Sequence, residues 1–523
     1  MHGHRRGGAV LLALALVTAV LSGCGSKAIS ASNTLNVVGG SELKDMAPIL
    51  ADAQRATGVK VVLTYTGSLD GADKIAAGSS AGAAWFASDK YIALAGASNK
   101  VLEHKNIMHT PVIIGVKRSV AARLGWSAGN VTWRDIARAA EDGKFHFAMT
   151  SPTASNSGFS ALVGVADALA NGEALSARTI DAARLRGFFK GQALTSGSSG
   201  FLVDAYEKSQ DKLDGIVNYE SVLVSMNASN QLHEPLVLLY PKEGIVTADY
   251  PFMLLNNQKR APYDKLVAYL TRADVQAKIQ STTGRRATTP GVAPDPRLPR
   301  TVLIEATFPA DLQVVQTLLD DYQTEFRRPA TTVYVLDVSG SMDGERLDRL
   351  KQALTGLTGL DTSFSGHFTR FNPREKVVLV VFNDAIVDTR SFTIGSTDPS
   401  SPALTQLRDT VNGLQAGGGT AIYSALQKAY DIAQTRVQSD PDSYVSIVLL
   451  TDGENNAGLA PEAFLSGLQS LPPSGRAVRV FSVLFGEANP KALQQVADAT
   501  GGQVFDARTA SLPDVFKEIR GYQ

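Results

Sequence analysis

The sequence predicts an α/β protein made of two successive α/β regions, and three observations support this prediction. Strand patterns alternate with helical patterns in both halves of the chain, separated by short polar turns, which is typical of sheets covered by helices. The chain has 523 residues, which is too many for one hydrophobic core. A proline-rich stretch at 289–299 divides the two regions.

The composition is that of a soluble globular protein, with 44% hydrophobic and 19% charged residues. Lys and Arg together number 50, as do Asp and Glu, so the formal net charge is zero. A domain that binds nucleic acid usually carries a basic excess. The charge balance therefore gives no support to nucleic-acid binding, and we expect no nucleic-acid partner.

The N-terminal segment has the features of an export signal. Arg5 and Arg6 precede an apolar run at 9–21, which is too short to span a bilayer comfortably and suits the core of a signal peptide. The run ends in Leu21-Ser22-Gly23-Cys24, and Cys24 is the only cysteine, which excludes a disulfide within the chain. An ordinary secretory signal with an incidental cysteine is the alternative.

This segment resembles a bacterial lipoprotein signal. The resemblance implies that residues 1–23 are removed and that the thiol of Cys24 carries a lipid such as palmitate, leaving 24–33 as a short lipidated tether. The sequence shows no second hydrophobic span. We therefore expect an extracytoplasmic chain that is lipid-anchored to the bacterial cell membrane and does not cross it.

The first large region is expected at 34–299. It opens with a strand at 34–38, a polar turn at 39–41 and a helical pattern, and a second strand at 59–65 ends in Thr66-Gly67-Ser68. The same order of strand, small polar turn and helix then recurs along the region. This alternation predicts an α/β sheet.

A linker is expected at 300–330, with an amphipathic helix at 310–326. Six apolar residues recur there at helical spacing: Leu312, Val315, Leu318, Leu319, Tyr322 and Phe326. An apolar stripe of this kind needs a surface to cover it. We therefore expect the helix to be packed and not to be a free spacer.

The second large region, at 331–523, alternates strands and helices regularly, which predicts a doubly wound, Rossmann-like sheet. The expected strands lie at 332–336, 377–382, 389–393, 443–450, 477–484 and 503–506. The expected helices lie at 346–358, 401–413, 421–434, 461–471, 489–500 and 512–521.

Three loops of this second region carry oxygen-bearing side chains. Asp337, Ser339 and Ser341 follow the apolar run at 333–336, Thr420 follows three glycines, and Asp452 follows the strand at 443–450. The carboxyl ends of parallel strands share one edge of a sheet, so these side chains are expected to meet. Hard oxygen ligands suit Mg²⁺ or Mn²⁺. The sequence therefore predicts a divalent-metal site, with simple helix capping as the alternative.

In this order and context the five residues resemble the metal-ion-dependent adhesion site of von Willebrand factor A (vWA) domains. That family pattern is Asp-x-Ser-x-Ser, a distant Thr, and an Asp after a hydrophobic strand. The resemblance implies that Ser339 and Ser341 bind the metal directly, while Thr420, Asp337 and Asp452 bind it directly or through water. Mg²⁺ keeps waters where protein ligands are missing. We therefore expect an acidic side chain of a protein partner to complete the metal shell.

Enzymatic alternatives find little support in the sequence. Phosphatases of the haloacid dehalogenase type place a second Asp two residues after the first, as general acid, and here Ser339 holds that position. The metalloprotease motif His-Glu-x-x-His, the hydrolase motif Gly-x-Ser-x-Gly and the P-loop motif do not occur. We therefore expect no catalytic residues and no enzymatic activity.

The first region resembles the type 2 periplasmic solute-binding fold, in which two α/β lobes flank a cleft. The segments at 64–68, 84–89, 110–117 and 147–152 carry this resemblance. Small polar turns before expected helices supply the candidate ligand-binding residues, and helix N-termini favour anions. These residues are Ser41, Thr66, Ser68, Ser88 and Ser157. Helix capping without a ligand is the alternative.

Two functions remain open from the sequence. The first is a surface-anchored lipoprotein that binds a protein partner through the metal site, while the solute-binding-like domain senses a small ligand or acts as a scaffold. The alternative is the substrate-binding receptor of an ABC-type importer for an oxyanion or another small polar solute, with the vWA domain as an accessory.

Overall fold

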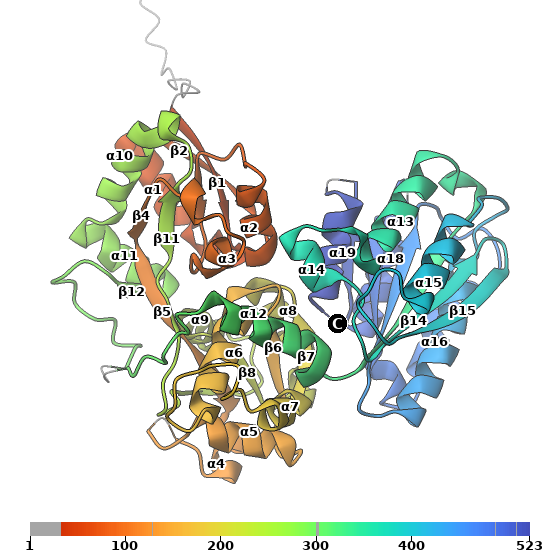
Figure 1. Cartoon of the computed structure of the whole chain (residues 1–523), viewed down its shortest axis with the longest axis horizontal. Coiled ribbons are helices and arrows are strands. Elements are labelled where there is room, and N and C mark those ends of the chain that lie inside the picture. The colour runs from red at the N-terminus through yellow and green to blue at the C-terminus, as the bar shows by residue number, and fades with distance from the viewer. Residues whose placement is uncertain (1–32, 128, 300–302, 487, 509, 523) are drawn as a thin grey trace, which may run out of the picture.

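The computed structural model describes residues 33–127, 129–299, 303–486, 488–508 and 510–522. The expected signal peptide, Cys24 and nearly all of the tether lie outside these ranges. The chain forms three α/β bodies, namely two lobes from the first region and a third domain from the second region (Figure 1). Within the described ranges, no helix is both long and apolar enough to cross a membrane.

The first lobe is built on a five-stranded sheet with the strand order β2-β1-β3-β11-β4. β1 runs parallel to β2 and β3, whereas β11 is antiparallel to β3 and β4. The strands are β1 (Thr34–Gly39), β2 (Lys60–Tyr65), β3 (Ala83–Trp85), β4 (Glu103–Asn106) and β11 (Pro251–Leu254). The main helices are α1 (Ala47–Thr57), α2 (Ser68–Ala76), α3 (Lys90–Leu94), α10 (Arg260–Leu270) and α11 (Ala273–Thr283).

The second lobe is built around the long strand β5 (Met108–Lys117), which is antiparallel to β8, β9, β10 and β12. The other strands are β6 (Phe147–Thr150), β7 (Gln192–Ser196), β8 (Gly215–Tyr219), β9 (Leu236–Leu239), β10 (Thr247–Ala248) and β12 (Arg286–Ala287). The helices are α4 (Arg118–Leu124), α5 (Trp133–Glu141), α6 (Asn156–Leu169), α7 (Ala182–Lys190), α8 (Ser199–Ser209) and α9 (Glu220–Ala228).

The chain crosses from the first lobe to the second between β4 and β5, returns between β10 and β11, and crosses again between α11 and β12, which pairs with β5. The first two crossing segments are tied together, because the Asn106 side chain donates to the Asp249 carboxylate at 2.9 Å.

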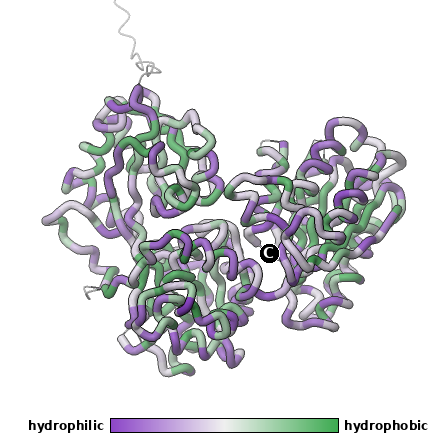
Figure 2. Tube along the Cα trace, in the orientation of Figure 1, coloured by the Kyte–Doolittle hydropathy of each residue, from purple (hydrophilic) through white to green (hydrophobic). Residues whose placement is uncertain are grey.

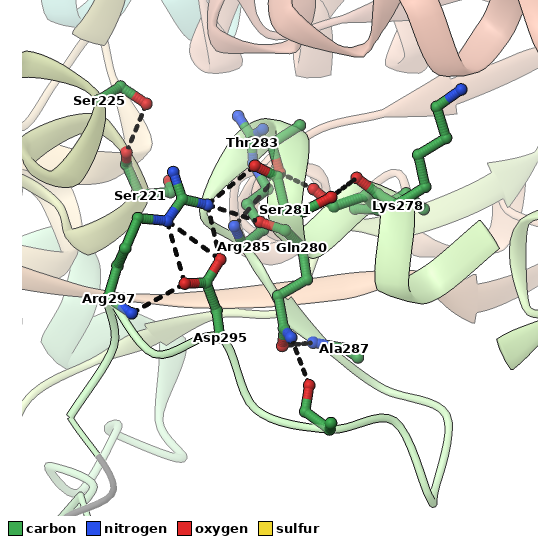
Figure 3. Close-up of polar contacts among 12 residues, drawn as sticks. Ser221, Ser225, Lys278, Gln280, Ser281, Thr283, Arg285, Ala287, Asp295 and Arg297 are labelled. Atoms are coloured by element: carbon green, nitrogen blue, oxygen red, sulfur yellow. Dashed lines mark hydrogen bonds and ion pairs between the residues drawn. The ribbon is translucent and has the colours of Figure 1, made fainter. Parts of the chain in front are cut away.

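The proline-rich loop that was expected at 289–299 is pinned to the end of α11 (Figure 3). The Arg297 guanidinium pairs with Asp295 at 2.6 Å and donates to the carbonyl oxygens of Gln280 and Ser281. The Gln280 side chain in turn donates to the carbonyl oxygen of Ala293 at 2.7 Å. The loop is therefore fixed to the first lobe by hydrogen bonds along its length.

The linker forms α12 (Leu312–Asp321), which continues as one π-helical turn at Tyr322–Phe326. Val315, Leu318 and Leu319 are fully buried. The ring of Phe189 on α7 lies 5.0 Å from the ring of Tyr322. The apolar stripe therefore packs on the second lobe from Val315 to Phe326, whereas Leu312, which was expected to belong to it, is 42% exposed.

The third domain contains a six-stranded sheet with the order β15-β14-β13-β16-β17-β18. All neighbouring pairs are parallel except β14 and β15, which are antiparallel. The strands are β13 (Ala330–Asp337), β14 (Glu375–Phe382), β15 (Ile386–Ile394), β16 (Tyr444–Thr451), β17 (Arg479–Leu484) and β18 (Gln503–Asp506). Figure 2 shows hydrophobic segments running through the interior of this sheet.

Two separate hydrophobic clusters show that helices cover both faces of this sheet. One cluster includes residues of α13 (Glu345–Thr355), α15 (Pro402–Asn412) and α19 (Leu512–Arg520). The other includes residues of α16 (Ile422–Ser439), α17 (Pro461–Gln469) and α18 (Pro490–Thr500). The doubly wound α/β fold class is confirmed. The short helix α14 (Phe364–Thr369) has no counterpart among the expected elements.

The third domain contacts both lobes through α14 and α19. On the first lobe, the Asp73 carboxylate of α2 accepts hydrogen bonds from the backbone amides of Phe364 and Ser365. On the second lobe, the backbones of Gly197 and Gly521 approach so closely that a Cβ on Gly521 would lie 2.6 Å from the Cα of Gly197. The three bodies therefore share one junction.

Candidate metal site and solute cleft

Asp337 is the last residue of β13, and its side chain is fully buried. Oδ1 accepts a hydrogen bond from the backbone amide of Ser339 at 2.8 Å, and Oδ2 accepts one from the Thr451 hydroxyl at 2.6 Å. Burial raises the pKa of the Asp337 carboxyl, and the hydrogen bonds from Thr451 and Ser339 oppose the rise. The carboxylate is thus held firmly where a nearby cation would favour its charged form.

Ser339, Ser341 and Asp452 lie next to this carboxylate. The hydroxyl oxygens of Ser339 and Ser341 are 3.1 Å apart, and the Ser341 hydroxyl donates to Asp452 Oδ1 at 2.8 Å. Because β13 and β16 are parallel neighbours, Asp337 and Asp452 leave the sheet at the same edge. Ser339 and Asp452 are buried, whereas Ser341 is exposed, so the cluster is reached from solvent on the side of Ser341.

Thr420 is brought to the cluster by the glycine-rich loop before α16. The Gly340 amide donates to the carbonyl oxygen of Gly418 at 3.0 Å, and Gly418 has a φ of +82°, which suits glycine. A Cβ built on Gly453 would lie 3.5 Å from Thr420 Oγ1 and 3.6 Å from Ser341 Oγ. The two hydroxyls therefore face the same small space beside Gly453.

The structure brings all five predicted metal-ligand residues together at one edge of the sheet. Among the described residues, no group of three or more His, Cys, Asp or Glu side chains is placed to hold a metal ion. The donors here are two carboxylates and three hydroxyls, a set of hard oxygens that fits Mg²⁺ or Mn²⁺. Their role as metal ligands stays a prediction.

Arg346 is a further charged group at this site that the sequence analysis missed. Its Nη1 lies 2.5 Å from Asp452 Oδ2 and 3.2 Å from the carbonyl oxygen of Ser341. The side chain is 37% exposed, while the Asp452 side chain is fully buried. No local pattern marks Arg346, since its carboxylate partner follows 106 residues later in the chain.

The predicted metal site lies at the carboxyl end of the strands β13 and β14. The contact of the third domain with the lobes, called the docked edge below, lies at the opposite end of these strands. Asp337 ends β13, and its register partner Phe382 ends β14. At the other end, Ala330 and Glu375 begin these strands, and Glu375 pairs there with Arg520 of the docked helix α19. The predicted metal site therefore points away from the junction with the lobes.

The predicted solute-contact residues fall into two groups. Ser88 and Ser41 face the opposite lobe: the Ser88 hydroxyl donates to Asn156 Oδ1 at 2.6 Å, and Ser41 Oγ would lie 3.5 Å from a Cβ on Gly200. The Ser41 hydroxyl is buried without a hydrogen-bond partner in the structure. These two residues therefore lie at the contact between the lobes.

Thr66 and Ser157 are hydrogen-bonded within their own lobes, while the turn that holds Ser68 lies beside the second lobe, since a Cβ on Gly67 would lie 3.2 Å from the carbonyl oxygen of Ala154. The Thr66 hydroxyl donates to Asp70 at 2.5 Å in the first lobe, and Ser68 is the first residue of α2. Ser157 is fully buried, and its hydroxyl lies 2.8 Å from those of Thr150 and Ser199 in the second lobe. The structure thus does not unite all five candidates at one point.

Arg285 is a cleft residue that the sequence reasoning did not single out. It is fully buried, pairs with Asp45 at 2.6 Å and donates to the carbonyl oxygen of Glu42 at 3.0 Å. Its guanidinium lies over the Tyr250 ring, 5.0 Å from the ring centre. Burial raises the pKa of Glu42 and of Asp45, and the Arg285 charge opposes both shifts. Arg285 follows the C-terminal glycine of α11, where no motif identifies it.

Comparison with protein families assigns both large regions. Residues 35–282 match the model of the bacterial extracellular solute-binding proteins. Residues 332–454 match the model of the von Willebrand factor type A domain.

Solved structures that the chain matches include two bacterial binding proteins. The ferric binding protein from Campylobacter jejuni is 13% identical, with a TM-score of 0.44, covering 55% of this chain and 98% of that chain. The sulfate-binding protein SubI from Mycobacterium tuberculosis is 17% identical, with a TM-score of 0.40, covering 50% and 89%. A von Willebrand factor type A protein from Catenulispora acidiphila is 23% identical, with a TM-score of 0.30, covering 38% and 43%.

Curated relatives match only part of the chain. Inter-alpha-trypsin inhibitor heavy chain H4 from Homo sapiens is 31% identical over 133 residues, which is 25% of this chain. Heavy chain H1 from Bos taurus is 30% identical over 131 residues, which is 24% of this chain. Each match spans 13% of the relative's own length. The two family matches show that the chain contains a bacterial extracellular solute-binding domain followed by a von Willebrand factor type A domain.

Proposed function

We propose that this protein is a lipid-anchored extracytoplasmic binding protein that holds a protein partner through a divalent metal ion. Asp337, Ser339, Ser341, Thr420 and Asp452 hold the Mg²⁺ or Mn²⁺, and an acidic side chain of the partner completes its shell. The solute-binding domain senses a small ligand or serves as the scaffold. The chain has no catalytic activity in this proposal, and Cys24 carries the lipid.

One observation supports this proposal above the others, namely the access to the cluster of oxygens. Asp337 and Asp452 are buried and rigidly hydrogen-bonded, while Ser341 is exposed beside them. A cation bound there would contact protein oxygens on its buried side. On the side of Ser341, which faces solvent, a coordination position would be left for another ligand. Mg²⁺ fills such a position with water, which an incoming carboxylate can replace.

Titration calorimetry of the whole chain with MgCl₂ and with MnCl₂ tests the metal step. We expect one site per chain, lost in the Asp337→Ala variant. Absence of any heat of binding for both metals in the wild-type chain would exclude the proposal.

The partner step is tested with immobilised peptides that carry either Glu or the matching Gln. Retention of the full chain on the Glu peptides in Mg²⁺, and its release by EDTA, is the expected result. Equal retention on both peptide sets, or retention that survives EDTA, contradicts recognition of a carboxylate through the metal. Mass spectrometry of the N-terminal peptide from membranes checks the lipid on Cys24.

A second candidate function is that of a substrate-binding receptor for an ABC-type importer. The observation in its favour is the buried Ser41 hydroxyl, which has no hydrogen-bond partner where the lobes meet, close to the fully buried Arg285, which donates to the carbonyl oxygen of Glu42. Buried polar groups are normally hydrogen-bonded, so unpaired ones mark a place where a ligand can bind. The guanidinium of Arg285 favours an anionic or other polar solute.

Thermal-shift measurements with phosphate, sulfate and molybdate test the receptor function. Stabilisation by one oxyanion that disappears in an Arg285→Gln variant supports it, with the exposed Arg272→Gln variant on the same lobe as the control. If none of the three anions stabilises the chain, the scaffold role of the first domain is favoured.

A further inference from the structure

Three observations indicate that Arg346 has an electrostatic role at the predicted metal site and does not merely fill space there. It lies in the first turn of α13, where a cation is disfavoured by the positive end of the helix dipole. Its guanidinium nevertheless reaches Asp452 Oδ2 at 2.5 Å. On the other side, a Cβ on Gly486 would lie 3.0 Å from Arg346 Cζ, so the glycine there leaves space for the guanidinium.

These contacts give Asp452 a counter-ion within the chain itself. Its Oδ1 accepts the Ser341 hydroxyl and its Oδ2 accepts Arg346, so both oxygens are occupied although the side chain is fully buried. A buried carboxylate without a partner is costly, and the guanidinium removes that cost. The same pairing places a positive charge next to the space that a metal would enter.

Resting on the proposed metal site, we propose that Arg346 is a built-in competitor of the metal ion that sets the metal affinity of the vWA domain. Its guanidinium is the counter-ion of the Asp452 carboxylate. A cation that binds must either displace the guanidinium from Asp452 or share that carboxylate with it. Either event costs free energy, so a higher metal concentration is needed to fill the site. The displaced guanidinium then remains beside the metal as a second positive group for the partner's carboxylate.

Titration calorimetry with MgCl₂ on three variants of the full chain tests the competitor role. Arg346→Gln should bind Mg²⁺ at least about tenfold more tightly, because a repulsion between unit and double charges a few ångströms apart is removed. Arg346→Lys, which keeps the charge, should stay near the wild type. Arg349→Gln is the matched control, since Arg349 is exposed on the same helix and pairs only with Glu345 in the described structure.

A second measurement separates this role from simple structural support. In EDTA, Arg346→Gln should melt at a lower temperature than the wild type, and saturating Mg²⁺ should abolish this difference in melting temperature. A melting temperature lowered equally in EDTA and in Mg²⁺ means a purely structural role and overturns the inference. Equal Mg²⁺ affinity of Arg346→Gln and wild type also overturns it, while leaving the proposed metal site intact.

The remaining outcomes distinguish the inference from the proposed function. If the wild type binds no Mg²⁺ and Arg346→Gln does, the competitor role stands and the native site is not a metal site under those conditions. If neither binds Mg²⁺ or Mn²⁺, both the proposed metal function and the inference fail.

A different set of contacts, at the docked edge, leads to a second inference. The lobes touch directly, since Ser88 donates to Asn156 and the Tyr91 hydroxyl donates to the carbonyl oxygen of Pro152. The vWA domain binds both sides of this contact. Asp73 of the first lobe holds the amides of Phe364 and Ser365, at 3.0 and 2.6 Å.

The second lobe is held at the same time. A Cβ on Gly521 would lie 3.3 Å from Ala154 Cβ as well as 2.6 Å from Gly197 Cα, which shows how closely the end of α19 packs there. The Gln323 side chain donates both to Thr153 of the second lobe, at 2.7 Å, and to the carbonyl oxygen of Phe368 in the vWA domain, at 2.9 Å. We infer that the vWA domain is a clasp that keeps the lobes closed, so that lobe opening requires α14 or α19 to undock.

Hydrogen exchange of the full chain tests the clasp. Asp73→Ala should speed exchange of the amides at 364–366 and also at 197–200, where the second lobe faces the cleft. Asp73→Asn, which keeps one acceptor oxygen, should give a smaller change of the same sign and serves if Asp73→Ala does not fold. Asp264→Ala, exposed on α10 of the same lobe, is the control. Faster exchange at 364–366 alone, with 197–200 unchanged, overturns the inference.

Discussion

Arg520, on the last helix of the vWA domain, donates to the Glu375 carboxylate at 2.7 Å, and their side chains are only 3% and 4% exposed. Arg327, at the end of the linker helix, donates to the same carboxylate oxygen. One buried carboxylate therefore ties the linker, the first residue of β14 and helix α19 together.

Replacing Glu375 by Gln should destabilise the vWA domain by about 3–5 kcal/mol, because it removes the buried carboxylate charge that the guanidinium groups of Arg327 and Arg520 share. Urea denaturation followed by circular dichroism measures the change. Glu345→Gln, at an exposed position of α13, is the control and should change stability by less than about 0.5 kcal/mol. A loss below about 1 kcal/mol for Glu375→Gln would show that the buried charges are compensated elsewhere.

Asp337→Ala should abolish Mg²⁺ binding without unfolding the domain. The carboxylate is removed from the centre of the site, and the Ser339 amide and Thr451 hydroxyl lose their acceptor, which costs about 1–3 kcal/mol. Calorimetry gives the metal affinity and circular dichroism gives the fold. Asp343→Ala, exposed near the same loop and outside the motif, should keep wild-type affinity. If Asp343→Ala loses Mg²⁺ binding as well, the ligand assignment is wrong.

Glu518 should make stability fall as the pH rises toward neutrality. Burial raises the pKa of its carboxyl from 4.5 to about 7, with Lys44 lowering it and Asp70 raising it from the first lobe. The folded state therefore binds the proton more tightly than the unfolded state. The stabilisation is complete below about pH 4.5 and is lost as the pH rises through about 7.

Melting temperatures of the wild type and of Glu518→Gln between pH 5 and pH 8 measure this contribution. The difference between the two proteins should change with pH over that range, and Glu462→Gln, exposed on α17, should run parallel to the wild type. A constant difference between the wild type and Glu518→Gln would show that Glu518 has an ordinary pKa in the folded chain.

Gly521→Ala should loosen the docking of the vWA domain on the second lobe. The added Cβ would lie 2.6 Å from the Cα of Gly197, which is backbone and cannot rotate away. Overpacking of this kind costs typically about 1–3 kcal/mol. Hydrogen exchange at 196–200 measures the loosening. Gly356→Ala is the matched control because nothing lies within 4 Å of its added Cβ, and equal protection in the two variants would contradict the close contact.

The central strands of the vWA sheet were predictable because β13, β14, β16 and β17 are mostly apolar and buried. The predicted strand at 332–336 is β13, and all eight of that strand's residues are buried. Asp337, Ser339 and Ser341 follow in the same local segment, so their meeting with Asp452 required only the parallel order of β13 and β16. Local pattern and sheet topology were sufficient there.

Features that depend on distant residues were not predictable in this way. Helix α14 has only six residues, and the amides of Phe364 and Ser365 at its start are satisfied by Asp73, which is 291 and 292 positions away. Arg346 looks like an ordinary helix residue until Asp452 is placed beside it. Asp45 and Glu42, the partners of Arg285, lie 240 and 243 positions away from it in the chain.

The eight residues of β13 separate two ends of the vWA sheet, one that faces the lobes and one that carries the predicted metal site. At about 3.3 Å per residue, the strand spans roughly 26 Å between the end that faces the lobes and the end that carries Asp337. A partner bound at the far edge would not compete for space with the solute-binding domain. Under the functions proposed above, one molecule would have room to hold a solute and a protein partner at the same time.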